Sequence, residues 1–159
     1  MNLFRWTACV GSLVIVAACG ETTAPRSSVR VGDIRLTVDA SAPEVQRGSA
    51  VTLRVTLVNE GAQEMTLHFS DGCQIVSIIR DASGEIVVPF GGSWACVAAL
   101  TQLTLVPGQP VVRDFVWTGS TAFQSEIPLR PLPSGRYFFS ATVPAGEGTL
   151  TAGTAIVLK

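Results

Sequence analysis

Polar and apolar residues alternate along most of the chain after residue 33. In Val51–Leu57 the odd-numbered positions are apolar and the even-numbered positions are polar. This is the pattern of a strand with one buried and one solvent-facing side. Ile34–Asp39 and Met65–Ser70 follow the same scheme, whereas Gln74–Arg80 is apolar on both sides and fits a central strand. Further strands are predicted at Glu85–Val88, Leu100–Val106, Val111–Trp117, Arg136–Val143 and Thr149–Leu158.

Short turn sequences such as Asn59-Glu60-Gly61, Pro107-Gly108 and Pro133-Ser134-Gly135 separate these segments at close intervals. Such punctuation predicts an all-β fold, an Ig-like antiparallel β-sandwich of about eight strands. Tyr137 follows the Pro133 turn at the start of a late strand. Two interpretations of Tyr137 stay open, the tyrosine corner of Ig-like folds and an ordinary inward-facing tyrosine.

The first 18 residues differ from the rest of the chain. Arg5 and the α-amine precede an apolar stretch that ends in Ala17-Ala18-Cys19. The stretch is shorter than the ~20 residues that a membrane-spanning helix needs. Small residues before a cysteine resemble a bacterial lipobox, which implies that residues 1–18 are a signal peptide. The same resemblance implies cleavage before Cys19 and diacylation of its sulfur.

A diacylated Cys19 would tether the protein to a membrane without spanning it, because two acyl chains give stable anchoring. Residues 19–28 are then the lipidated cysteine and a polar tether, and residues 29–159 are the β-sandwich. We expect an exported protein, anchored by lipid to the cell membrane or the outer membrane.

Charge and motifs exclude several classes of function. The chain has 11 Lys and Arg against 12 Asp and Glu, which argues against nucleic acid as a partner. The single histidine, His68, gives little acid–base capacity, and no phosphate-binding loop or nucleophile elbow occurs. The sequence therefore predicts no enzymatic activity, no catalytic residue and no cofactor.

Cys73 and Cys96 are the two cysteines left after Cys9 leaves with the signal peptide and Cys19 becomes the anchor. In an exported protein we predict that they form a disulfide. A zinc site would need two further ligands, and no metal is expected. A nucleophilic Cys73 beside His68 and Asp71 would need an unpaired thiol.

Two connections are longer than simple turns and are candidate binding loops. One contains Phe90 and Trp94 among glycines, and the other, residues 118–134, contains Phe123, Ile127 and Leu129 among prolines. The alternative for residues 118–134 is a segment folded back over an open edge or end of the sandwich.

The middle of the chain resembles the BsuPI-type proteinase inhibitor domain. The resemblance rests on Val51–Gly61 with its Asn-x-Gly end, Met65–Gly72, Ile79–Val87, Leu103–Gly108 and Pro133–Tyr137, and it covers about residues 45–143. It implies an Ig-like β-sandwich and a protein partner, a subtilisin-like serine protease.

Two functions stay open at this stage. One is a proteinase inhibitor or protein-binding module whose rigid loop enters a protease cleft in extended form. The other is a non-inhibitory structural or assembly module of the cell envelope, since Ig-like sandwiches host many functions.

Overall fold

The structure, a computed structural model, describes residues 24–124, 129–145 and 148–159. The predicted signal peptide, the predicted lipidation site Cys19 and the candidate contact residue Ile127 lie outside the described residues. Among the residues that are described, no helix is long and apolar enough to cross a membrane.

The described residues form strands joined by turns and loops, as the alternation predicts. The strands are β1 (Arg26–Val31), β2 (Ile34–Ala40), β3 (Glu44–Val45), β4 (Val51–Asn59), β5 (Met65–Phe69), β6 (Val76–Arg80), β7 (Ile86–Val88), β8 (Thr101–Leu105), β9 (Val111–Trp117), β10 (Gly135–Ala145) and β11 (Gly148–Leu158).

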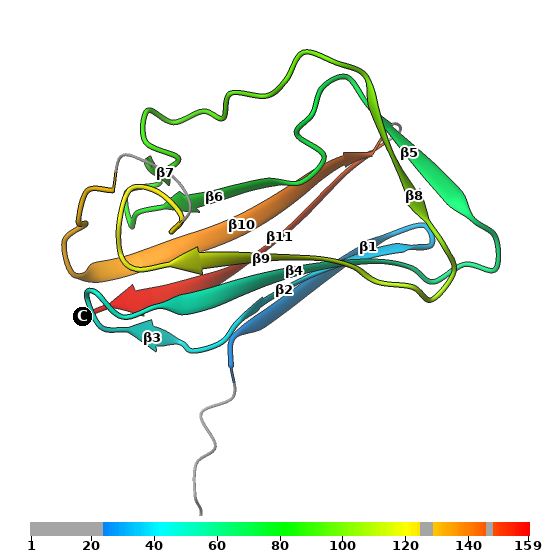
Figure 1. Cartoon of the computed structure of the whole chain (residues 1–159). Coiled ribbons are helices and arrows are strands. Elements are labelled where there is room, and N and C mark those ends of the chain that lie inside the picture. Colours follow the sequence, from blue (N-terminus) through cyan, green and yellow to red (C-terminus); the bar gives the residue numbers. More distant parts are fainter. Residues whose placement is uncertain (1–23, 125–128, 146–147) are drawn as a thin grey trace, which may run out of the picture.

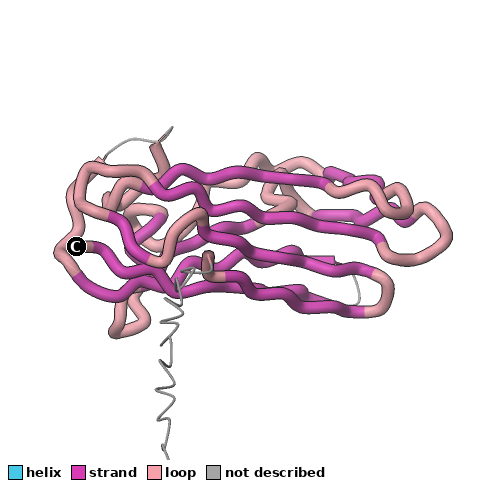
Figure 2. Tube along the Cα trace, turned by 90° about the horizontal axis from the view of Figure 1, so that it is seen from below, coloured by secondary structure: helices cyan, strands magenta, loops and turns pink. Residues whose placement is uncertain are grey.

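Two sheets form the layers of a β-sandwich (Figure 1). One has the order β1-β2-β4-β9 and the other β3-β11-β10-β6-β7, while β5 and β8 form a separate pair. Figure 2 shows the strands running along the long axis of the molecule. The pairing is antiparallel except between β3 and β11, which are parallel. The predicted antiparallel sandwich is therefore confirmed.

The core lies where the alternation places it. Val51, Leu53, Val55 and Leu57 of β4 are all 1% exposed or less, and they belong to one hydrophobic core with apolar side chains of β10 and β11. Burial of this kind is the main favourable contribution to folding. The period-two pattern of the sequence is thus the direct cause of the two-layer arrangement.

Tyr137 closes one end of the sandwich. Its ring packs edge-on against Trp117, with the ring centroids 5.3 Å apart. Its hydroxyl donates a hydrogen bond of 2.7 Å to the carbonyl of Pro133, four residues earlier, and burial raises the pKa of this phenol. A tyrosine near the start of a strand that bonds to the backbone just upstream has the geometry of a tyrosine corner, which decides between the two interpretations.

The predicted boundary between tether and sandwich at residue 29 is wrong. Residues 26–31 form β1, which pairs in antiparallel register with β2, from Arg26 opposite Asp39 to Val31 opposite Ile34. β1 lies at the edge of its sheet and pairs only with β2. Its residues can therefore be largely polar, without the alternating apolar residues of the buried strands. The sandwich therefore begins at Arg26, three residues before the predicted boundary.

Residues 118–134 fold back on the sandwich in the part that the structure describes. The N–H of Thr121 donates to the carbonyl of Arg130, and the N–H of Leu132 donates to the carbonyl of Gly119. Phe123 and Leu132 are buried. The interpretation of this segment as a cover over the end of the sandwich fits these contacts better than a projecting loop.

Candidate functional site

The connection from β7 to β8 contains a segment that stands away from the core, residues 94–100, here named the Cys96 loop. Every residue from Ala95 to Leu100 is exposed. In Figure 1 the connection crosses the top of the molecule, on the side opposite the start of β1. The structure thus presents this loop on a side far from the point where the chain enters the sandwich.

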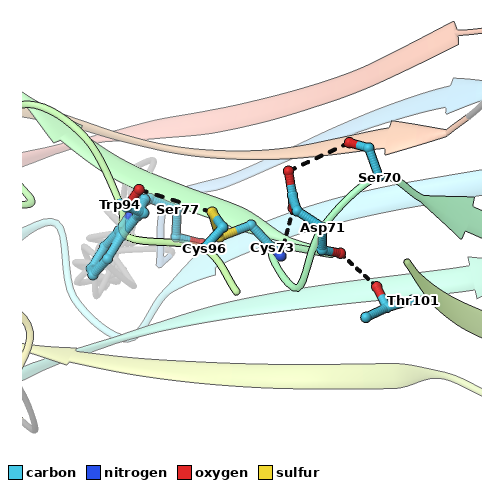
Figure 3. The surroundings of a disulfide bond; sticks show 7 residues. All are labelled: Ser70, Asp71, Cys73, Ser77, Trp94, Cys96 and Thr101. Carbon is cyan, nitrogen blue, oxygen red and sulfur yellow. Dashed lines mark hydrogen bonds between the residues drawn. A yellow bond between two sulfur atoms is a disulfide. The ribbon is translucent and has the colours of Figure 1, made fainter. Parts of the chain in front are cut away.

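Three contacts fix the Cys96 loop to one turn, residues 71–73, and Figure 3 shows two of them, the disulfide and the hydrogen bond of Thr101. A disulfide joins Cys96 to Cys73, with the Cα atoms 5.4 Å apart. The N–H of Gly72 donates to the carbonyl of Val97 at 2.9 Å. At the far end, the hydroxyl of Thr101 donates to the carbonyl of Asp71 at 2.6 Å. Both ends of the exposed segment are therefore anchored to the same support.

The supporting turn is itself held in shape by short hydrogen bonds. The carboxylate of Asp71 accepts a hydrogen bond of 2.8 Å from the N–H of Cys73, an arrangement that stabilises turns. The side-chain amide of Gln74 donates to the carbonyl of Gln102 in β8 at 3.0 Å. Hydrogen bonds at both Thr101 and Gln102 thus connect this turn to the start of β8.

Trp94 holds the first end of the loop against the protein. Its indole N–H donates to the carbonyl of Ser77 in β6 at 2.8 Å. Its ring stacks on Phe123, with an interplanar angle of 8° and centroids 6.1 Å apart. A hollow of about 370 Å³ lies beside it, lined by Trp94, Phe115, Arg113 and the turn around Cys73. Trp94 is therefore part of the support of the loop rather than its exposed surface.

Two large apolar side chains project from the loop. Leu100 is 88% exposed and Val97 is 72% exposed, the highest values among the large apolar residues of the described chain. Single exposed apolar residues are common. Val97 and Leu100, however, lie on a segment that is covalently anchored at Cys96, and such anchoring restricts the movement of its backbone.

The structure brings the two predicted binding loops together, but it does not expose all of their residues. Phe90 is 49% exposed and Leu129 is 47% exposed. The guanidinium of Arg130 lies 4.3 Å from the centroid of the Phe90 ring, a cation–π contact that joins the two connections.

The prediction that Phe123 presents a binding surface is wrong. Phe123 is only 2% exposed, because its ring packs against Trp94, Phe115 and Phe139. An aromatic side chain with three aromatic neighbours belongs to the core.

The disulfide between Cys73 and Cys96 leaves Cys73 without the free thiol that metal binding or nucleophilic attack would need. Ligand atoms of Asp71, Cys73 and Cys96 lie within 4.8 Å of one another. However, the two sulfurs are bonded to each other, so neither is a thiolate for a metal or for nucleophilic attack. His68 is exposed on β5, opposite Gln102 of β8.

Sequence reasoning missed Val97 and Leu100. It assigned Leu100 to the strand that follows and gave Val97 no role. The available signal is that Val97 directly follows Cys96 and that Leu100 lies four residues after it, in a connection that the predicted disulfide fixes to the Asp71-Gly72-Cys73 turn.

Comparison with known proteins gives one family and a group of solved structures. Residues 36–148 match the model of the BsuPI family, described as "Intracellular proteinase inhibitor". No curated protein matches the chain. A β-glucosidase from Listeria innocua in complex with glucose is 13% identical over 79% of this chain, with a TM-score of 0.44. The β-glucosidase EmGH1 from Erythrobacter marinus is 15% identical over 86% of this chain, with a TM-score of 0.43. The chain spans 16% of the length of each of these two enzymes.

Proposed function

This chain belongs to the BsuPI family of intracellular proteinase inhibitors, and we propose that it is an exported, lipid-anchored member that inhibits a serine protease through the Cys96 loop. The observation that carries the proposal is the anchored, exposed loop, with both ends fixed to residues 71–73. We propose no enzymatic activity for the chain itself.

A rigid exposed loop is what an inhibitor needs. A protease binds an extended segment by backbone hydrogen bonds and by pockets for side chains. An inhibitor gains affinity over a substrate because its loop loses little conformational entropy on binding. The disulfide at Cys96 and the hydrogen bonds of Val97 and Thr101 provide this rigidity.

Export is supported by the same disulfide. Disulfides persist in oxidising compartments and are rare in the cytosol. The apolar leader that ends at Cys19 supplies both an export signal and an acylation site. The family description says intracellular, so this chain would be a member adapted to the other side of the membrane.

A lipid anchor at Cys19 would place the Cys96 loop on the side of the sandwich that faces away from the membrane. With Cys19 in the membrane, at most residues 20–25 separate the bilayer from β1. Six residues span ~20 Å at most, so the start of β1 would lie near the bilayer surface. The Cys96 loop lies on the opposite side of the sandwich (Figure 1). The module would therefore present the loop to soluble or surface-bound proteases, away from the membrane.

The first test is inhibition by the full chain, produced in an exporting bacterium and extracted in mild detergent. We expect stoichiometric loss of activity for at least one of four probes: subtilisin, chymotrypsin, pancreatic elastase and trypsin. Residual activity against a chromogenic peptide measures it. A chain that remains folded by circular dichroism and inhibits none of the four would contradict the proposal and favour the non-inhibitory envelope module.

The second test concerns the anchor. We expect the wild-type chain to incorporate labelled palmitate and to sediment with membranes, because two acyl chains give stable anchoring. The variant Cys19→Ala should incorporate none, whereas Cys9→Ala, a matched change inside the leader, should behave as wild type. Palmitate incorporation by Cys19→Ala would refute lipidation at this residue.

A further inference from the structure

We propose that Leu100 is the side chain that enters the primary specificity pocket of the target protease, and that the peptide bond between Leu100 and Thr101 lies across its catalytic serine. This assignment rests on the proposed function and names its reactive residue and the class of its target.

Val97 and Leu100 of the Cys96 loop are both exposed enough to fill a pocket, and the hydrogen bonds of their backbone carbonyls distinguish between them. The carbonyl of Val97 accepts hydrogen bonds from the N–H groups of Gly72 and Ala99, both at 2.9 Å. A scissile carbonyl must instead be free to enter the oxyanion hole of the protease. Within the described part of the chain, no backbone hydrogen bond of a turn or loop ends on the carbonyl of Leu100. Leu100 is also the more exposed of the two, at 88%.

The anchors lie on both sides of the bond. On the amino side, the disulfide of Cys96 and the carbonyl of Val97 fix the chain to residues 72 and 73. On the carboxyl side, the hydroxyl of Thr101 bonds to Asp71, and Thr101 pairs with Phe69 in the β5–β8 ladder. Three residues, 98–100, thus bridge two points on one turn.

This arrangement has a chemical consequence. When the catalytic serine attacks the carbonyl carbon of Leu100, the bond from that carbon to the nitrogen of Thr101 breaks. The nitrogen leaves as an amine, with a proton from the general acid of the protease, and Leu100 is left as an ester on the serine. The amine of Thr101 is still held at Asp71, so it can attack the ester, return the serine its hydroxyl and re-form the peptide. Hydrolysis by water must compete with this intramolecular step, which proximity favours.

The side chains that precede the bond define the class of target. Ala98 and Ala99 are small and exposed, and Leu100 is a branched aliphatic residue. Such a sequence suits a serine endopeptidase whose primary pocket is uncharged and apolar. It does not suit a protease whose pocket contains an aspartate for Arg or Lys.

The test compares variants of the full chain against the same four proteases, subtilisin, chymotrypsin, pancreatic elastase and trypsin. For a protease that the wild type inhibits, Leu100→Ala should raise the inhibition constant about 10- to 100-fold, because a buried leucine side chain contributes that much to affinity. Leu100→Arg should lose this inhibition and gain inhibition of trypsin. The matched control Val31→Ala, an aliphatic residue of β1 that is 47% exposed and lies outside the Cys96 loop, should change the constant by less than about threefold.

Prolonged incubation with the inhibited protease gives an independent measurement. We expect one cut, with a new amino terminus at Thr101 by mass spectrometry, and fragments that remain associated until denaturant is added. Inhibition by wild type that neither Leu100 variant changes would overturn this assignment and leave the proposed function standing. Failure of the wild-type chain to inhibit any probe would overturn both. Because Leu100→Arg gains an activity, misfolding cannot imitate the expected result.

Discussion

Removing the disulfide is expected to lower the free energy of unfolding by about 3 kcal/mol and to abolish inhibition. Cys73 and Cys96 are 23 positions apart, and opening a loop of this size restores roughly that much chain entropy to the unfolded state. In the folded state, the double variant Cys73→Ala/Cys96→Ala keeps only hydrogen bonds between the Cys96 loop and its support. Urea denaturation followed by tryptophan fluorescence measures the stability, and protease titration measures the function.

Reductant provides the matched control for this variant. Dithiothreitol should shift the urea midpoint of the wild type toward that of the double variant and leave the double variant unchanged. Trp94, which stacks on Phe123 beside the disulfide, should report the loosened loop through its emission. Equal urea midpoints for oxidised wild type and double variant would show that the bond contributes nothing to the fold.

The strands of the sandwich could be predicted from the sequence because their cause is local. In β4 every second residue is buried, and the apolar residues Val51, Leu53, Val55 and Leu57 occupy these positions in the sequence. β1 was not predicted because its strand conformation depends on pairing with the neighbouring strand β2. Arg26-Ser27-Ser28 carries no apolar alternation, and only pairing with β2, helped by an ion pair of 3.2 Å between Arg26 and Asp39, makes it a strand.

The site was harder to predict, because exposure of an apolar residue depends on the tertiary fold. Leu100 reads as the first apolar residue of a strand, and Phe123 reads as a loop residue among prolines. The structure contradicts both interpretations, because Leu100 is exposed and Phe123 is buried. Phe123 becomes core because Trp94 and Phe115 reach it from other segments, whereas Leu100 has no sheet to cover it. The cysteine pair is the exception, since two remaining cysteines in a chain with a predicted export signal are enough to predict the bond.

Replacing Asn59 by leucine is expected to cost about 3–5 kcal/mol of stability, the sum of several unpaired buried groups. Asn59 ends β4 and is fully buried. Its amide N–H₂ donates to the carbonyls of Gln63, at 2.7 Å, and Leu105, at 2.9 Å. Its amide oxygen accepts from the N–H of Gly61 at 2.9 Å. One side chain thus connects the end of β4, the following turn and the end of β8, and leucine branches at the same carbon but has no polar atom.

A change at Gln63 separates this effect from general damage to the turn. Gln63 accepts through its backbone carbonyl and its residue is exposed, so Gln63→Ala should alter stability by less than about 0.5 kcal/mol. An Asn59→Leu variant within 1 kcal/mol of wild type would contradict the role of the amide. Asn59 bonds to Leu105, at the opposite end of β8 from Leu100. The folded fraction of Asn59→Leu should therefore inhibit with the wild-type constant, while loss of the disulfide should impair stability and inhibition together.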